Sequence, residues 1–224
     1  MIELIRIKSF LKIKEFRYPE KLIIDNSFDI IKIYSFKNLD KKGWLKESHC
    51  TMMVNLLKSN DLLFKDMNKN YQKHIRREER EEIEVSLTNK EEDFLSFYNG
   101  VYLNLCRDKK LKKYPLEFLK QGDLWLARKD GKILSGVVIF NDQDYASQSF
   151  AASEHIEYNG SRLLIWEAIK YYKLKGLKWF NFGGGESDYK RRFGSERTEV
   201  WLYINYCSLK AKRLNWLRNK ILFR

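Results

Sequence analysis

The chain has 224 residues, 44% of them hydrophobic, which is enough for one large domain with its own core. Its 43 Lys and Arg against 30 Asp and Glu leave a formal net charge of +13, which favours an anionic partner, a solubility surface being the alternative. No run is long and apolar enough for a transmembrane helix, no signal peptide is recognisable, and three isolated cysteines argue against a disulfide framework or a zinc site. We therefore expect a cytoplasmic, globular protein without a metal.

The N-terminal fifty residues are strand-like. Short β-branched runs at 22–24 and 30–34 predict strands, separated by a polar turn. We expect residues 1–50 to form a short strand-rich extension or layer of their own.

An amphipathic helix is predicted over residues 62–80. Its apolar positions recur every four residues, at Leu63, Met67, Tyr71 and Ile75. The other face is basic, and the helix ends among Glu78, Glu79, Glu81 and Glu82. The basic charge is therefore either paired within the helix or available to bind phosphate.

The middle of the chain alternates strands and helices. A strand is predicted at 83–85, a second amphipathic helix over 90–106, and a short helix after Pro115. Three apolar runs follow, at 124–128, 133–140 and 145–152, joined by polar turns. Such runs predict an antiparallel meander.

The helix predicted over 161–175 connects the meander to another strand. Ser161 is a candidate N-cap and Gly176 ends the helix. A helical crossover from the meander makes the following strand, 179–182, parallel to its neighbour. A last strand is predicted at 199–206. Because a parallel junction in such a sheet splays, a ligand can enter there, near the amino end of the crossover helix, whose unpaired N–H groups suit a pyrophosphate.

The strand at 179–182 runs into three glycines, Gly183 to Gly185, and then into the cation-rich sequence 188–194. Glycines at the end of a strand give a flexible turn that accommodates a small molecule, and the cations favour an anion. We expect the chemistry of the protein at this turn.

Three segments in this order resemble the GNAT acyltransferase superfamily, in particular the branch of the Fem peptidoglycan aminoacyltransferases and related acetyltransferases of polysaccharide clusters. They are the basic helix at 67–77, the crossover helix at 163–169 and the sequence from Phe180 to Gly194. The match covers about Thr51 to Tyr203. It implies an α/β (α+β) fold with a mixed, mostly antiparallel sheet, a splayed parallel junction and flanking helices, a GNAT-like domain over 51–206 and a basic C-terminal helix over 207–224.

The resemblance implies transfer of an acyl or aminoacyl group to an amine of a cell-envelope precursor. The acceptor is a nucleotide- or lipid-linked amino sugar of a surface polysaccharide, or a muropeptide. The donor is either an acyl-CoA, such as acetyl-CoA, or an aminoacyl-tRNA. The alternative is a non-catalytic basic adaptor that binds RNA or an anionic membrane on an acyltransferase scaffold.

The site residues follow from the resemblance and the required chemistry. Lys190 is the candidate to stabilise oxyanion charge or bind phosphate, an exposed loop lysine being the alternative. Asp188 and His155 are the candidate proton acceptors, with Glu154, Glu186 and bulk water as alternatives. The candidate substrate-binding residues are Arg107, Arg76, Arg77, Phe150, Asn181, Gly183, Tyr189 and Arg191. The candidate cofactor-binding residues, at the start of the crossover helix, are Asn159, Gly160, Ser161 and Arg162. Asn181 stands where the Fem pattern usually has Asp, and Phe150 where it has Tyr.

The C-terminal helix, 210–224, carries six cations and no acid. It either packs on the domain with a wet basic face or lies on an anionic membrane, with Trp216 as an interfacial anchor. The second alternative places the protein peripherally at the inner face of the membrane.

Overall fold

The computed structural model describes residues 2–8, 11–17, 27–39, 42–142, 144–154 and 158–222. The chain forms two compact units, a small unit of Met1–Cys50 with Thr198–Arg224, and a large unit of Thr51–Arg197. Strands β4 (Leu45–Asn55) and β10 (Glu196–Tyr206) each continue from one unit into the other.

The sheet of the large unit has the strand order β4-β9-β8-β7-β6-β5. Its other strands are β5 (Glu84–Thr88), β6 (Asp123–Lys129), β7 (Lys132–Asn141), β8 (Tyr145–Ser153) and β9 (Trp179–Gly184). The predicted meander is β6 to β8. Strands β8 and β9 pair in parallel, joined through helix α6 (Ser161–Leu174), whereas the neighbours on either side are antiparallel. The predicted α/β class, with a mostly antiparallel sheet and one parallel junction, is confirmed.

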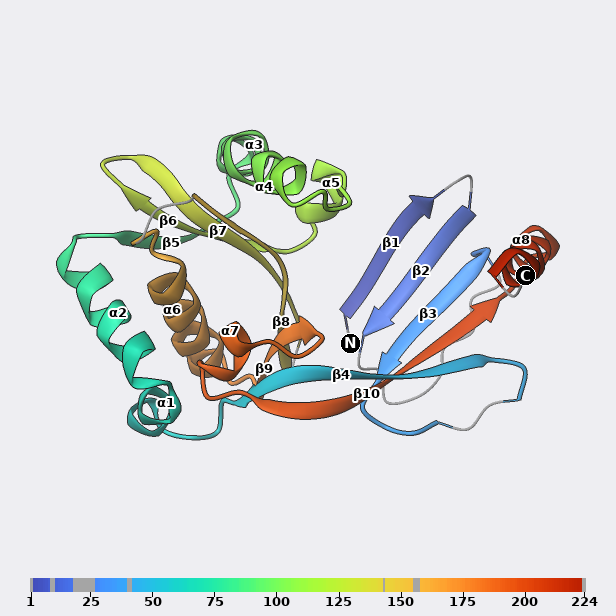
Figure 1. Cartoon of the computed structure of the whole chain (residues 1–224), viewed down its shortest axis with the longest axis horizontal. Helices are drawn as coiled ribbons and strands as arrows, with labels where there is room; N and C mark the ends of the chain where they lie inside the picture. The colour runs from blue at the N-terminus through green and yellow to red at the C-terminus, as the bar shows by residue number, and fades with distance from the viewer. Residues whose placement is uncertain are drawn as a thin grey trace. The chain divides into compact units, whose positions relative to one another are not determined.

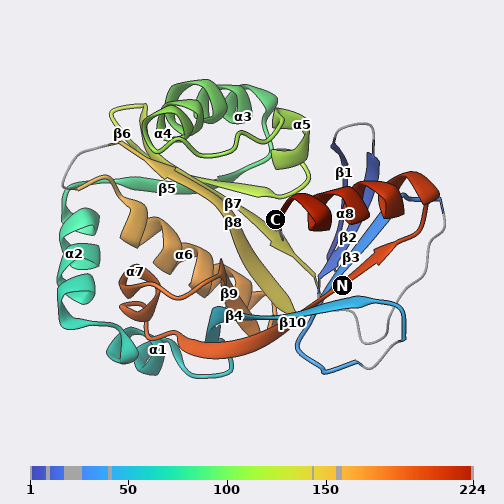
Figure 2. The same cartoon turned by 45° about the vertical axis from the view of Figure 1, so that its right-hand side comes forward.

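Helices cover both faces of this sheet (Figures 1 and 2). One face carries α6 together with α1 (Asn60–Asp66), α2 (Lys69–Arg80) and α7 (Asp188–Arg191). The other carries α3 (Glu91–Phe97), the π-helix η1 (Tyr98–Tyr102), α4 (Leu103–Asp108) and α5 (Leu116–Leu119). The core between α2, α6 and the sheet includes Ile75, Ile139, Leu164, Ile169 and Phe180.

The prediction of a single helix over 62–80 is wrong, because Met67 and Asn68 interrupt it and separate α1 from α2. Met67 is extended, with ψ 151°, and the Asn68 side chain caps α2 by accepting a hydrogen bond from the Asn70 N–H at 2.9 Å. Met67, Tyr71 and Ile75 are nevertheless all buried, so the four-residue repeat identified the buried side of the segment correctly. The helix predicted over 90–106 is confirmed as α3, η1 and α4, with a π-helical turn in its middle.

The small unit has the strand order β1-β2-β3-β10. Strand β2 (Leu11–Arg17) pairs antiparallel with β1 (Ile2–Lys8) and parallel with β3 (Ile30–Ser35), which pairs antiparallel with β10. Helix α8 (Leu209–Leu222) packs through Ala211 into the cluster that holds Leu202 and Ile204. The predicted strand at 22–24 lies outside the described residues. None of the helices that the structure describes is long and apolar enough to span a membrane.

Candidate active site

The parallel junction is short. Strands β8 and β9 pair from Tyr145↔Trp179 to Ser147↔Asn181, whereas β8 stays paired with β7 as far as Ser153. A bulge at Ser149 shifts the register of β8 against β7 directly beyond this point. Because a bulge bends its strand, it turns β8 away from β9 where their pairing ends. The gap at the carboxyl ends of two parting strands is where sheets of this kind accept ligands.

The end of β9 is fixed by two buried polar side chains. Asn181 is 0% exposed, and its Oδ1 accepts a hydrogen bond from the Gly183 N–H at 2.8 Å. The Thr51 hydroxyl, also buried, lies within hydrogen-bonding distance of Asn181 Oδ1 and of the Gly183 carbonyl oxygen. The Asn181 side chain therefore faces the protein and holds the start of the glycine turn.

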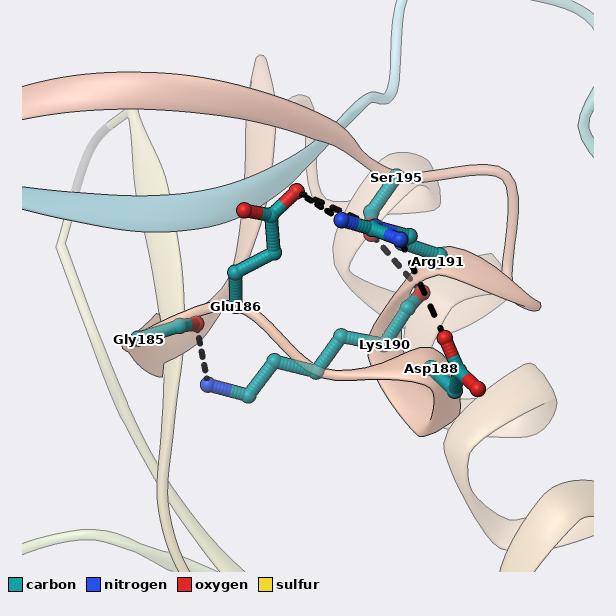
Figure 3. Close-up of polar contacts among 6 residues, drawn as sticks. All are labelled: Gly185, Glu186, Asp188, Lys190, Arg191 and Ser195. Carbon is teal, nitrogen blue, oxygen red and sulfur yellow. Dashed lines mark hydrogen bonds and ion pairs between the residues drawn. The ribbon is translucent and has the colours of Figure 1, made fainter.

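Lys190 closes this turn from the side of α7. Its Nζ donates to the carbonyl oxygens of Gly183 at 2.9 Å, Gly184 at 2.6 Å and Gly185 at 2.9 Å. Figure 3 shows the side chain extended along the turn toward Gly185, while the Ser195 hydroxyl donates to the Lys190 carbonyl oxygen at 2.7 Å. The cation predicted from the sequence thus lies at the end of β9, and it contacts the backbone there.

The other charged groups of α7 pair with one another (Figure 3). Arg191 donates to Glu186 Oε1 from Nε at 3.0 Å and from Nη2 at 2.6 Å, and this hydrogen bonding raises the pKa of Arg191. Its Nη1 lies 3.8 Å from Asp188 Oδ1. Asp188 is 79% exposed, so a proton that it accepts can pass directly to water. His155 lies outside the described residues.

A buried acid sits at the start of α6. Glu78, from α2, is 0% exposed, its Oε2 accepts a hydrogen bond from the Leu163 N–H at 2.9 Å, and its Oε1 lies 3.6 Å from Arg162 Nη1. Burial raises the pKa of Glu78, and the Leu163 N–H opposes this. The predicted N-cap at Ser161 is wrong, because Gly160 takes the cap position with φ 71° and without a side-chain hydrogen bond. A Cβ on Gly160 would lie 2.7 Å from that of Ala127.

Two N–H groups at the start of α6 are already engaged within the protein. We expected unpaired N–H groups at this helix end, and this is wrong for Leu163, because its N–H already donates a hydrogen bond to Glu78. Asn159 Oδ1 accepts from the Ser161 N–H at 3.1 Å, so this donor is also engaged. A diphosphate would meet a buried carboxylate where it needs hydrogen-bond donors.

Aromatic packing holds α7 against α2. The Tyr189 ring centroid lies 6.3 Å from that of Tyr71 and 5.4 Å from that of Phe193. Burial raises the pKa of Tyr189 and of Tyr71, so both phenols stay protonated near neutrality. The Arg162 guanidinium lies over the Tyr71 ring at 5.2 Å. The glycine turn, α7 and the start of α6 are thereby connected through one packed cluster.

Four exposed cations form a line on α2, which we call the basic stripe. They are Lys69, Lys73, Arg76 and Arg80. Their spacing of four, three and four residues places them on one side of the helix. Within the described ranges, none of the four pairs with a carboxylate. Arg77 differs, because it donates to the Tyr158 hydroxyl at 2.6 Å and lies 3.8 Å from Glu81.

The two remaining candidates lie on the other face of the sheet. Arg107 is exposed on α4, where its guanidinium donates to the Asn104 side chain. Phe150 packs into an aromatic cluster, with ring centroids 4.9 Å from Tyr114 and 5.9 Å from Phe118. The structure therefore groups Asn181, Gly183 and residues 188–191 at one turn, whereas the Arg107 side chain and the Phe150 ring lie on the opposite face of the sheet.

Two residues of this region were not predicted as site residues, Thr51 and Glu78. The sequence does contain a signal for Glu78, because Tyr71, Ile75 and Glu78 follow the helical spacing of a buried stripe. The sequence analysis considered Glu78 only as one of four acids that could pair with the basic charge of the helix, whereas in the structure it is buried and pairs with the start of α6. Thr51 has no comparable signal, since its partners are 130 residues away or more.

Part of the large unit matches a known protein family. Residues 116–191, from α5 to α7, match the family model of the acetyltransferase (GNAT) domain. The resemblance to GNAT acyltransferases that the sequence motifs indicate is confirmed.

Among solved structures, the fold is similar to FemX, with a TM-score of 0.65 and 11% identity over 89% of this chain and 83% of that chain. It is also similar to the C-terminal domain of a putative lysylphosphatidylglycerol synthetase from Agrobacterium fabrum, with a TM-score of 0.63 and 13% identity over 98% and 85%. The fold is similar as well to L-PGS from Bacillus licheniformis, with a TM-score of 0.57 and 14% identity over 86% of this chain and 73% of that chain. At such identities the likeness concerns the fold. A search of curated proteins finds no match.

Proposed function

We propose that this chain is an N-acyltransferase that moves an aminoacyl group from an activated ester to an amine of a cell-envelope precursor. The observation that carries the proposal is the end of the β8–β9 pairing at Ser147↔Asn181, next to a glycine turn that is held by a cation. An acyl group that enters this gap lies beside fixed positive charge, which acyl transfer requires.

The reaction needs few groups from the protein. The neutral amine attacks the acyl carbonyl carbon, a C–N bond forms, and the tetrahedral intermediate carries the charge on oxygen. The C–O bond of the ester then breaks, the departing oxygen takes up a proton to leave as a hydroxyl, and the attacking nitrogen gives up its proton. Asp188, at the turn and in contact with water, is the proposed proton acceptor, together with His155. Lys190 supplies positive charge at the turn.

The start of α6 supports one of the two possible donors. Glu78 occupies the position at which a helix N-terminus would bind the diphosphate of coenzyme A. An aminoacyl-tRNA carries its acyl group on a ribose and contains no diphosphate like that of coenzyme A, so it needs no diphosphate site at this helix end. The basic stripe on the neighbouring α2 suits an RNA backbone, because its four cations lack carboxylate partners among the described residues. We therefore favour aminoacyl-tRNA over acyl-CoA.

The acceptor is proposed to be a nucleotide- or lipid-linked muropeptide or amino sugar. Two of the similar structures are named FemX and a putative synthetase of lysylphosphatidylglycerol, an aminoacylated lipid. Helix α8 adds a second argument for a lipid-linked acceptor. It buries Ala211 in the small unit but exposes Leu209, Leu214 and Trp216, which suits peripheral contact with an anionic membrane.

A donor comparison tests the proposal. The purified chain is incubated with a muropeptide or an amino-sugar nucleotide and either radiolabelled aminoacyl-tRNA or acetyl-CoA. We expect label on the acceptor from aminoacyl-tRNA and no thiol release from acetyl-CoA. Thiol release with acylated product would establish the coenzyme donor instead. Salt-sensitive RNA binding without transfer from either donor would identify a non-catalytic adaptor.

A further inference from the structure

We propose that Lys190 is a positioning residue and that the backbone N–H groups of Gly185 and Glu186 bind the oxygen of the acyl carbonyl. The inference rests on the proposed acyl transfer and assigns its oxyanion donors to the backbone. Lys190 acts through the turn, because its ammonium group already has three carbonyl oxygens within 2.9 Å.

The direction of the two N–H groups follows from peptide geometry. The described chain has no cis peptide bond, and a trans peptide points its N–H opposite to its C=O. The carbonyls of Gly184 and Gly185 point at Lys190 Nζ. The N–H groups that share those peptides, of Gly185 and Glu186, therefore point away from Nζ to the other side of the turn.

These two donors are available to a ligand. Gly185 and Glu186 are exposed, and neither N–H finds an acceptor among the residues that the structure describes. Gly185 has φ 78°, and the space around a Cβ there is open. The backbone is left-handed at this point, so the glycine keeps the turn in this shape without strain.

The charges around the turn strengthen these donors. A carbonyl that accepts from an ammonium group is polarised, and hydrogen bonds in a chain reinforce one another, so the N–H of the same peptide becomes a stronger donor. The Glu186 carboxylate would oppose an oxyanion, but Arg191 pairs with it at 2.6 Å. The positive charge of Lys190 is thus transmitted to the outer side of the turn.

The turn lies where the strands part. A Cβ on Gly183 would lie 3.1 Å from the carbonyl oxygen of Gln148, the first residue of β8 beyond its pairing with β9. Gly183 therefore still lies against β8, and open space begins at Gly184 and Gly185, where a Cβ would meet nothing within 4 Å. In the proposed reaction, an acyl carbonyl that enters there binds the Gly185 and Glu186 N–H groups while the amine attacks its carbon. The developing negative charge on oxygen is stabilised there until the ester C–O bond breaks.

Binding of a small tetrahedral anion tests the site without turnover. The ¹⁵N-labelled full chain is titrated with methylphosphonate, and amide shifts are followed by NMR. We expect saturable shifts of the Gly185 and Glu186 amides, weakened at least tenfold in affinity by Lys190→Met. Lys178→Met is the matched control, because Lys178 is an exposed cation paired with Asp144 before the other end of β9. Shifts that miss these two amides, or that survive Lys190→Met unchanged, would overturn the inference.

Turnover then separates geometry from charge. A guanidinium keeps the charge but cannot place three N–H groups toward three carbonyls as an ammonium does. We expect Lys190→Arg and Lys190→Met each to lower kcat by about 10- to 100-fold, with the KM for the acceptor within about twofold. Lys190→Arg at the wild-type kcat would refute the positioning role. If Lys190→Met does not fold, the NMR titration and the turnover assay are both done with Lys190→Arg. Absence of any turnover by the wild type concerns the proposed function alone, and the titration still decides the inference.

Discussion

Replacing Glu78 measures what the buried carboxylate contributes to the start of α6. Glu78→Ala leaves the Leu163 N–H without its acceptor and Arg162 without its carboxylate at 3.6 Å. Loss of one partner from a buried charged pair costs about 3–5 kcal/mol of unfolding free energy. Glu78→Gln keeps an oxygen for the Leu163 N–H and removes a charge that burial disfavours, so its stability near pH 7 should stay within about 1 kcal/mol of wild type.

The pH dependence gives the sign of the charge effect. Burial raises the pKa of Glu78 in the folded chain above its value in the unfolded chain. Between the two pKa values the folded chain holds a proton that the unfolded chain has lost, so wild-type stability falls as pH rises through that window, by about 1.4 kcal/mol for each pKa unit of difference. Glu78→Gln does not titrate, so its stability relative to wild type rises through the same window.

Urea denaturation of the three chains from pH 4 to pH 8 checks both expectations. Equal losses for Glu78→Gln and Glu78→Ala at pH 7 would refute the reasoning, because the attraction to Arg162 would then outweigh the hydrogen bond to the helix end. A stability difference between Glu78→Gln and wild type that stays constant with pH would refute the raised pKa.

Three further predictions concern the turn and α2. Thr51→Val removes the hydroxyl that contacts the end of β9 and should cost about 1–2 kcal/mol in urea denaturation, whereas Thr51→Ser should stay close to wild type. Gly183→Ala adds a methyl group at φ 78° against the backbone of β8, and Gly176→Ala, the control, adds one at φ 84° in open space. Each should lower stability by about 1–2 kcal/mol because of backbone strain, but only Gly183→Ala should also lower kcat. A variant with alanine at all four positions of the basic stripe should bind tRNA with a weaker salt dependence, the slope of log affinity against log salt concentration falling in magnitude by about 3 to 4. A control variant with alanine at the four lysines of 109–113 should keep the wild-type slope. An unaltered slope in the stripe variant would exclude α2 as the RNA contact.

Local patterns predicted the centre of the large unit well. The meander is marked by apolar runs between polar turns, the crossover helix by its helical spacing, and the strand at 179–182 by the glycines after it. The parallel pairing of β8 with β9 follows from the helical crossover between them. The break of the predicted helix at Asn68 was missed, because the apolar repeat continues across it and a lone Asn inside such a repeat resembles a surface residue. A capping side chain is decided by backbone geometry, which the repeat does not encode.

The sequence indicated where the candidate site lies along the chain, but it did not indicate which atoms its side chains contact. The glycines and the cations after them mark the end of β9, yet which atoms Lys190 contacts depends on how the turn folds back. The partners of Thr51 and Glu78 are distant in sequence, at Gly183 and Leu163, so only the assembled sheet and helix pair bring them together. Long-range polar pairs leave no periodic signal in the chain.

The cations that follow the glycine turn show why a charged sequence motif does not identify an anion site by itself. Lys190 holds backbone carbonyls, Arg191 pairs with Glu186, and Arg192 lies 5.9 Å over the Tyr71 ring. Each is engaged in the fold, so an added phosphate there would compete with an existing contact. In the basic stripe on α2, Arg76 lies 5.3 Å over the Phe64 ring and Arg80 donates to the Arg76 carbonyl oxygen, but none of the four cations pairs with a described carboxylate, so the stripe is the better phosphate contact. In the proposed reaction, the turn therefore acts on the uncharged acyl carbonyl through its N–H groups, and the basic stripe on α2 contacts the phosphates of the donor.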